Sequence, residues 1–103
     1  MRVTFNGRVV AESARALLMC EGNYLPVFYI PREDADAALL ERTNHSTYCP
    51  YKGAASYFSI RIGGRVAENA IWTYEQPYSA VAEIKNYLAF YPNRVDAIEE
   101  IEG

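Results

Sequence analysis

An alternation of side chains that ends at two glycines most constrains how this chain folds. Between residues 56 and 62, small or apolar residues occupy the even positions, whereas polar and aromatic residues occupy the odd ones. A period of two residues is typical of a β-strand, because successive side chains point to opposite faces of a sheet. Gly63-Gly64 follows at once and favours a tight hairpin turn. The sequence therefore predicts a strand that turns back to form a hairpin.

Similar strand signals recur along the chain. Asn6-Gly7 tolerates positive φ at both central positions of a type I′ turn, so residues 3–10 are predicted to form another hairpin. Further strands are predicted over residues 26–30 and 70–74, and over residues 15–21, where a helix turn is the alternative. Residues 95–101 are expected to be a weak final strand or an irregular tail.

Two short helices are predicted between the strands. In residues 33–42 the acidic side chains come first, which matches a helix dipole, and Asp34 is expected to compensate the positive helix start. In residues 80–88 apolar side chains recur at helical spacing behind Ser79, a good N-cap. The polar residues 43–47 are predicted to be a loop.

Together these signals predict a mostly β chain of about six to eight short strands and two short helices. The strands are expected to form a single, partly closed antiparallel sheet, with the helices at an edge or an end. At 103 residues the chain has the length of one domain, so residues 1–103 are predicted to fold as one unit.

Composition and charge exclude several classes of partner. The net charge is −3 and the ten basic residues are scattered, whereas nucleic-acid binding needs a basic stripe, so no nucleic acid is predicted. No apolar run approaches the ~20 residues that span a bilayer, and the first residues lack the apolar core of a signal peptide. The sequence thus predicts a cytoplasmic protein with no membrane partner, in which Cys20 and Cys49 stay reduced.

Reactive side chains are concentrated in residues 47–57. Cys49 precedes a proline-led turn and Lys52 lies beyond it, so the turn is expected to bring the ammonium near the sulfur. A neighbouring cation makes a thiol a better nucleophile, and His45 upstream is a candidate base. One hypothesis is therefore an enzyme with Cys49, Lys52 and His45 as catalytic residues. The alternatives are a Schiff base at Lys52, or a buried Cys49 beside a solvated Lys52.

Aromatic residues make up 14% of the chain, with nine tyrosines and one tryptophan. Such side chains line ligand sites as well as cores, because they join rigid apolar faces to polar edges. Where they converge they would wall a pocket for a small, partly apolar ligand that is anionic or bears an amide; the alternative is a tyrosine-rich core. Lys52 and Arg15 are the expected polar anchors, and Glu21 the counter-charge. The predicted ligand-binding residues are Tyr57, Trp72, Tyr74, Tyr29, Arg15 and Glu21, with Tyr48 nearby.

Metal and cofactor signals are weak. His45, Cys49 and Cys20 offer three possible zinc ligands, but no fourth is evident. The sequence has no glycine-rich phosphate loop of Walker type and no closely spaced carboxylates on a strand for Mg²⁺. No metal and no cofactor are therefore predicted, and Cys20 is expected to be a small buried side chain on the strand over residues 15–21.

Four stretches carry a family resemblance: Tyr29-Ile30-Pro31 with Asp34, Cys49-Pro50-Tyr51-Lys52-Gly53 with Ala55 and Tyr57, Ala70-Ile71-Trp72-Thr73-Tyr74 with Pro77, and Tyr87-Leu88-Ala89-Phe90-Tyr91-Pro92. In these, over nearly its whole length, the chain resembles the small bacterial domain of unknown function 427, sometimes filed under a nucleotidyltransferase label. The resemblance implies a tent-like, mostly β sheet similar to the Mss4-like architecture. Several relatives of that architecture hold zinc with four cysteines, but this chain has two, so no zinc is implied.

Three functions are compatible with these observations. The favoured one is a module that binds a small molecule without catalysis. The second is an enzyme that uses Cys49 as an activated thiol in redox or acyl chemistry. The third is a protein-interaction domain that presents an exposed aromatic patch.

Overall fold

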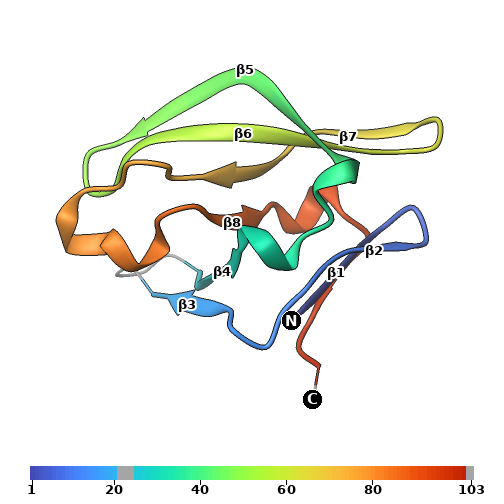
Figure 1. Ribbon diagram of the computed structural model, residues 1–103, viewed down its shortest axis with the longest axis horizontal. Coiled ribbons are helices and arrows are strands. Elements are labelled where there is room, and N and C mark those ends of the chain that lie inside the picture. Colours follow the sequence, from blue (N-terminus) through green and yellow to red (C-terminus); the bar gives the residue numbers. More distant parts are fainter. Residues whose placement is uncertain (21–24, 102–103) are drawn as a thin grey trace.

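The computed structural model describes residues 1–20 and 25–101, and its strands form two antiparallel sheets (Figure 1). One sheet has six strands in the order β3-β4-β8-β7-β6-β5, and the other has three in the order β2-β1-β9. The predicted mostly β, antiparallel class is confirmed, but the strands are divided between two sheets rather than joined in one. The strands are β1 (Arg2–Phe5), β2 (Arg8–Glu12), β3 (Leu17–Met19), β4 (Val27–Pro31), β5 (Leu40–Cys49), β6 (Gly53–Ile62), β7 (Arg65–Thr73), β8 (Tyr87–Phe90) and β9 (Ala97–Glu99).

Both predicted hairpins are present. Asn6 and Gly7 link β1 to β2 with φ of 49° and 77°, the left-handed backbone that a type I′ turn needs at both positions. Gly63, with φ of 59°, turns β6 back so that Ile62 pairs with Arg65 at the start of β7. The second hairpin forms a long arm of the six-stranded sheet (Figure 1).

The helix predicted over residues 33–42 is wrong. The chain instead forms two short 3-10 turns, η1 (Arg32–Asp34) and η2 (Ala37–Leu39), and β5 then begins. Pairing with β6 overrides the helical charge pattern, because the first residues of β5 are held by the sheet. The predicted loop over residues 43–47 also lies within β5, where the pairing register shifts between Arg42 and Ser46.

The second predicted helix is also wrong over most of its length. Its first part is η3 (Ser79–Ile84), a 3-10 segment in which Val81 has non-helical angles (φ −128°, ψ 31°) and Tyr78, not Ser79, is the N-cap residue. Its last part is β8, which is followed by another 3-10 turn, η4 (Pro92–Arg94). The helical spacing fails because Ile84 and Leu88 pack into two different buried clusters.

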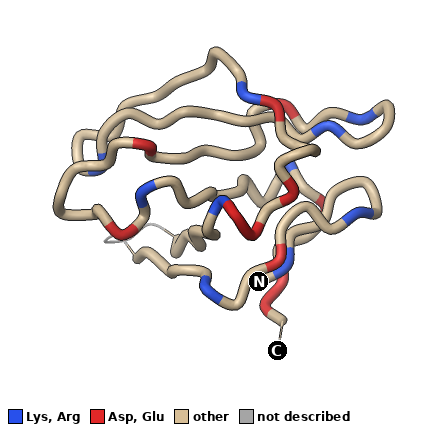
Figure 2. Tube along the Cα trace, in the orientation of Figure 1, with Lys and Arg blue, Asp and Glu red and all other residues tan. Residues whose placement is uncertain are grey.

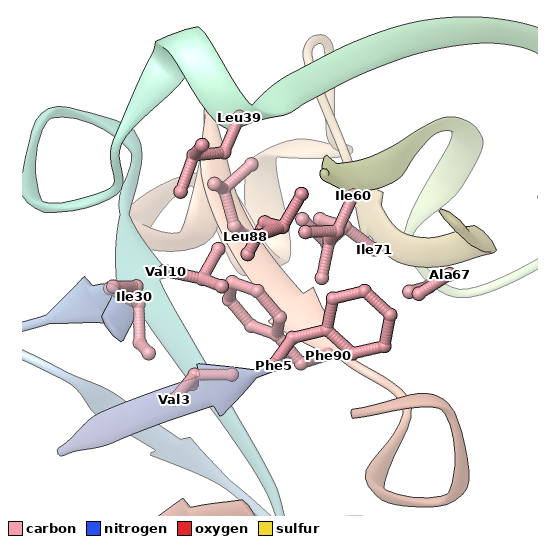
Figure 3. Close-up of a cluster of buried hydrophobic side chains, with 13 residues drawn as sticks. Val3, Phe5, Val10, Ile30, Leu39, Ile60, Ala67, Ile71, Leu88 and Phe90 are labelled. Carbon is pink, nitrogen blue, oxygen red and sulfur yellow. The ribbon is translucent and has the colours of Figure 1, made fainter. Parts of the chain in front are cut away.

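The main core lies between the two sheets (Figure 3). Val3 and Phe5 from β1 meet apolar side chains from the six-stranded sheet, among them Ile71 of β7 and Leu88 of β8. Each fully buried aliphatic side chain of this size contributes about 1.5–3 kcal/mol relative to an exposed one. This cluster therefore holds the small sheet against the large one.

The opposite face of the six-stranded sheet carries a second buried cluster. The alternation on β6 divides its side chains, so that Ile60 packs into the main core whereas Ala55 and Tyr57 pack into the second cluster. Tyr29 of β4 and Tyr74, just beyond β7, join that cluster. Most of the sequence-predicted site residues lie on this second face.

The position of Cys20 corrects a prediction. β3 ends at Met19, so Cys20 lies just beyond the strand and is exposed rather than buried. Its thiol is free, as is that of the partly buried Cys49.

Charged residues are dispersed over the molecule (Figure 2). One cluster joins distant segments, since Arg32 and Arg42 both donate hydrogen bonds to Glu75. The hydrogen bond from Arg42, supported by those from Arg32 and Ser56, lowers the pKa of Glu75 to about 2 despite its partial burial. No helix among the described residues has the length and apolar character to cross a membrane.

Candidate functional site

A cavity of about 740 Å³ opens on the second face of the six-stranded sheet. Met19 of β3 and Thr47 of β5 both line it, although these strands are the two edges of the sheet. The sheet must therefore curl around the cavity, and Figure 1 shows β5 and β6 on one side of β8 with β3 and β4 on the other. The sequence-predicted residues that line this cavity are Cys49, Lys52, Tyr57, Trp72, Tyr74 and Tyr29.

Two other cavities have a different character. One, of about 650 Å³, is lined by Ser13, Leu18 and Phe28 among others, and one of about 360 Å³ lies near Val3 and Ile98. Among the described residues, neither is lined by a cysteine, lysine, histidine or tyrosine. The cavity with the thiol and the ammonium is therefore the candidate site.

A tight turn places the thiol beside the ammonium. The backbone N–H of Lys52 donates to the carbonyl of Cys49 at 3.2 Å, which closes the turn between β5 and β6. Gly53 follows with φ of 110°, and a Cβ there would lie 3.4 Å from the carbonyl oxygen of Gln76. The chain then returns as β6, and the Nζ of Lys52 donates to the Sγ of Cys49 at 3.7 Å.

Lys52 is not a solvated charge, since only 8% of its surface is exposed. Its ammonium lies 6.0 Å from the centre of the Tyr74 ring, within reach of a cation–π interaction. Burial of an ammonium is costly unless such partners compensate the lost water. The sequence-based alternative of a solvated Lys52 is therefore wrong.

Three hydroxyl groups form a chain along the cavity wall. The Oη of Tyr57 lies 3.0 Å from the Oγ1 of Thr47 and 3.3 Å from the Oη of Tyr91. Burial, together with the hydrogen bond that Tyr91 shares with Tyr57, raises the pKa of Tyr91 to about 12, against the opposing effect of Arg94. The phenol of Tyr91 thus keeps its proton at neutral pH.

Trp72 connects the aromatic walls of the cavity. Tyr29 meets it edge-on, with ring centres 6.4 Å apart, and Tyr91 meets it at a tilt, with centres 4.5 Å apart. Such pairs are held by the attraction between ring faces and ring edges as well as by burial. Residue selection from the sequence missed Tyr91 and Thr47, although Tyr91 stands in the Tyr87–Pro92 stretch that carried the family resemblance.

Two of the predicted site residues that the structure describes are not brought to the cavity. His45 is exposed on β5, where its ring packs edge-on against Tyr57 with centres 4.4 Å apart, and it does not line the cavity. Arg15 lies outside the cavity too, and pairs with Asp34 at 3.0 Å and Glu33 at 3.1 Å. Glu21 falls outside the described residues.

Asp34 has a tertiary role rather than the predicted helix-start role. It accepts a hydrogen bond from the Oγ of Ser13 at 2.5 Å and one from Arg15 at 3.0 Å. The Ser13 bond first, then the Arg15 bond, lowers the pKa of Asp34 below its usual value. The carboxylate therefore ties η1 to the segment between β2 and β3.

Metal ligands do not gather in the described part of the chain. No group of three or more histidine, cysteine, aspartate or glutamate side chains there is arranged to hold an ion. The polar groups that the described residues bring to the cavity are thus a thiol, an ammonium and hydroxyls.

The comparison with known proteins identifies a family but no activity. No curated protein matches this chain. A family model described as a domain of unknown function matches residues 1–101, nearly the whole chain. The matched range includes the cavity-lining residues Cys49, Trp72 and Tyr91. The chain therefore belongs to the family of the domain of unknown function 427.

Proposed function

We propose that this protein binds a small, partly apolar molecule in the cavity on the second face of the six-stranded sheet. The observation that carries the proposal is the convergence of aromatic side chains and a few polar groups on one cavity of about 740 Å³. Ligand sites typically have volumes of about 300–1,000 Å³, mostly apolar walls and a small number of placed polar groups. Lys52 and the hydroxyl chain supply those polar groups here.

Two reporters in the chain make the proposal testable. Trp72 is the single tryptophan, so intrinsic tryptophan fluorescence reports on the cavity wall. Cys49 lines the cavity, whereas Cys20 is exposed and lies outside it. The alkylation rate of Cys49 therefore reports on the cavity, and that of Cys20 serves as the surface reference.

The experiment screens a diverse set of small metabolites for both signals. A ligand in the cavity should change Trp72 emission and slow the alkylation of Cys49 by iodoacetamide, while the rate at Cys20 stays the same. Thr47→Phe should abolish both effects, because the new ring fills the cavity mouth from an exposed position on an edge strand. A screen in which no compound protects Cys49 would contradict the proposal.

A second candidate function is thiol chemistry at Cys49. The hydrogen bond from the Nζ of Lys52 to the Sγ of Cys49 favours it, because a neighbouring ammonium stabilises a thiolate. This chemistry needs a reduced thiol, which fits a cytoplasmic setting. The test is the rate of alkylation against pH in the protein and in Lys52→Met. If both proteins give the same profile at Cys49, and Cys20 gives it too, this candidate is rejected.

A further inference from the structure

We infer that the ligand of this cavity is a flat, conjugated molecule that presents a neutral carbonyl oxygen to the Thr47–Tyr57–Tyr91 hydroxyl chain. The inference rests on the proposed function and names its ligand class. It comes from a count of hydroxyl protons, from the nature of the cavity walls and from the residue types that the walls lack.

The proton count leaves one donor for a ligand. Thr47, Tyr57 and Tyr91 each carry one hydroxyl proton, and the three groups share two hydrogen bonds. Two protons lie within the chain of hydroxyls, so the third points out of it. It comes from Thr47 or Tyr91 when both hydrogen bonds run in one direction, or from Tyr57 when Tyr57 accepts from both neighbours. Among the described residues no further acceptor bonds these hydroxyls.

The protonation of the chain favours a neutral acceptor. Because burial and the hydrogen bond with Tyr57 raise the pKa of Tyr91 to about 12, its phenol stays protonated at neutral pH and can donate a hydrogen bond. A carbonyl oxygen accepts such a hydrogen bond and, unlike a carboxylate or a phosphate, brings no charge of its own into a partly buried site.

The walls favour a flat ligand. Of the fourteen described residues that line the cavity, seven are aromatic, among them Trp72, Tyr29 and Tyr74. Rigid ring faces and edges pack best against another planar, unsaturated group. A carbonyl conjugated to a ring places its oxygen in the plane of that ring, so one molecule can meet both the walls and the hydroxyl chain.

The lining residues do not suit a phosphorylated ligand. Phosphate sites usually combine arginine forks, the N-termini of longer helices or clustered backbone N–H groups. In the described part of the chain the cavity is lined by one basic side chain, Lys52, whose ammonium contacts Cys49 and Tyr74, and by no arginine. The helical segments described there are short 3-10 turns. This favours an uncharged carbonyl compound over a nucleotide.

The test compares 1-indanone, indane and phenyl phosphate by isothermal titration calorimetry. The first two share a carbon skeleton and differ in one carbonyl group. We expect 1-indanone to bind about tenfold more tightly than indane, because indane leaves the hydroxyl donor without an acceptor. Phenyl phosphate should bind more weakly than 1-indanone.

Matched variants assign the preference to the hydroxyl chain. Thr47→Val, Tyr57→Phe and Tyr91→Phe each remove one candidate donor. The variant that removes the donor facing the ligand should reduce the ratio between 1-indanone and indane to about twofold, with the loss falling on 1-indanone. Tyr87→Phe makes the same chemical change at a tyrosine that does not line the cavity, and should leave the ratio unchanged.

The outcomes separate the two proposals. Equal binding of 1-indanone and indane, or tighter binding of phenyl phosphate, would overturn the carbonyl inference and leave the cavity as a binding site. Binding of none of the three probes, with no protection of Cys49 by any compound of the metabolite screen, would overturn both. The comparison in the unaltered protein decides the inference even if a hydroxyl variant does not fold.

Discussion

The hydroxyl of Tyr57 lies 3.3 Å from the hydroxyl of Tyr91, although 34 residues separate the two in the sequence. β6 and β7 pair, and β7 and β8 pair, so Tyr91 arrives beside Tyr57 only when all three strands are in register. The contact thus reports on the assembly of the sheet as well as on the cavity.

Removal of these hydroxyls should have unequal effects on stability. Tyr57→Phe breaks two hydrogen bonds and should lower the free energy of unfolding by about 1–2 kcal/mol, whereas Tyr91→Phe breaks one and should cost about 1 kcal/mol. Urea denaturation of both variants and of the double variant measures the coupling between them. Strict additivity would show that the two hydroxyls do not interact, and Tyr51→Phe is the control.

Gly53→Ala should destabilise the protein by about 1–3 kcal/mol, because an L-residue at φ of 110° is strained and the new Cβ would meet the backbone at Gln76. Gly64→Ala is the matched control: nothing lies within 4 Å of its Cβ, and its change should stay within about 0.5 kcal/mol. Thermal unfolding measures both. Equal melting temperatures for the two variants would show that the turn tolerates a side chain.

Glu75→Gln should lower the free energy of unfolding at neutral pH and make that free energy depend less on pH in the acidic range. The pKa of Glu75 is lowered from 4.5 to about 2 by Arg42, Arg32 and Ser56, so its contribution is present above about pH 4.5 and is lost as the pH falls towards 2. After discounting for partial exposure, we expect a loss of about 1–2 kcal/mol at pH 7.

Chemical denaturation of Glu75→Gln and of the unaltered protein between pH 7 and pH 2 checks this prediction. The difference in unfolding free energy should shrink as the pH falls below about 4.5. A difference that stays constant across the range would show that the carboxylate charge contributes nothing.

Leu88→Ala should be among the most destabilising single changes, at about 2–5 kcal/mol, because it opens a void in the fully buried core between the sheets. Leu18→Ala changes the same residue type on β3, where the side chain is 52% exposed, and should cost no more than about 0.5 kcal/mol. Urea denaturation compares them. Similar midpoints would contradict the assignment of Leu88 to the core.

The strands were predictable where the signal is local. The hairpin at Asn6-Gly7 follows from backbone preferences of those two residues, and the two faces of β6 follow from its alternation. That alternation also explains why Tyr57 and other chosen residues reach one cavity, since alternate positions on neighbouring strands share a face. The turn between Cys49 and Lys52 was predictable for a similar reason.

The remaining features depend on pairing between distant segments. Leu88 looked like part of a helical stripe, but its neighbours are Ile30 and Thr73, which no local pattern reveals. Arg15 was expected at the pocket, yet it pairs with Asp34 outside the cavity. The sequence does not reveal this pairing, because it depends on the position of η1 in the fold. Tyr91 entered the site in the same way, through the register of β8 against β7.

The three-stranded sheet has its central strand between partners that lie far apart in the chain. β1 pairs with β2 through a two-residue turn, but its other edge pairs with β9, so that Arg2 faces both Glu12 and Glu99. Contacts of such long sequence separation slow folding, because the intervening chain loses conformational entropy before the strand pairing stabilises the fold. During synthesis one edge of β1 therefore stays unpaired until almost all of the described chain has been made. We expect the pairing of β9 with β1 to be a late step in folding.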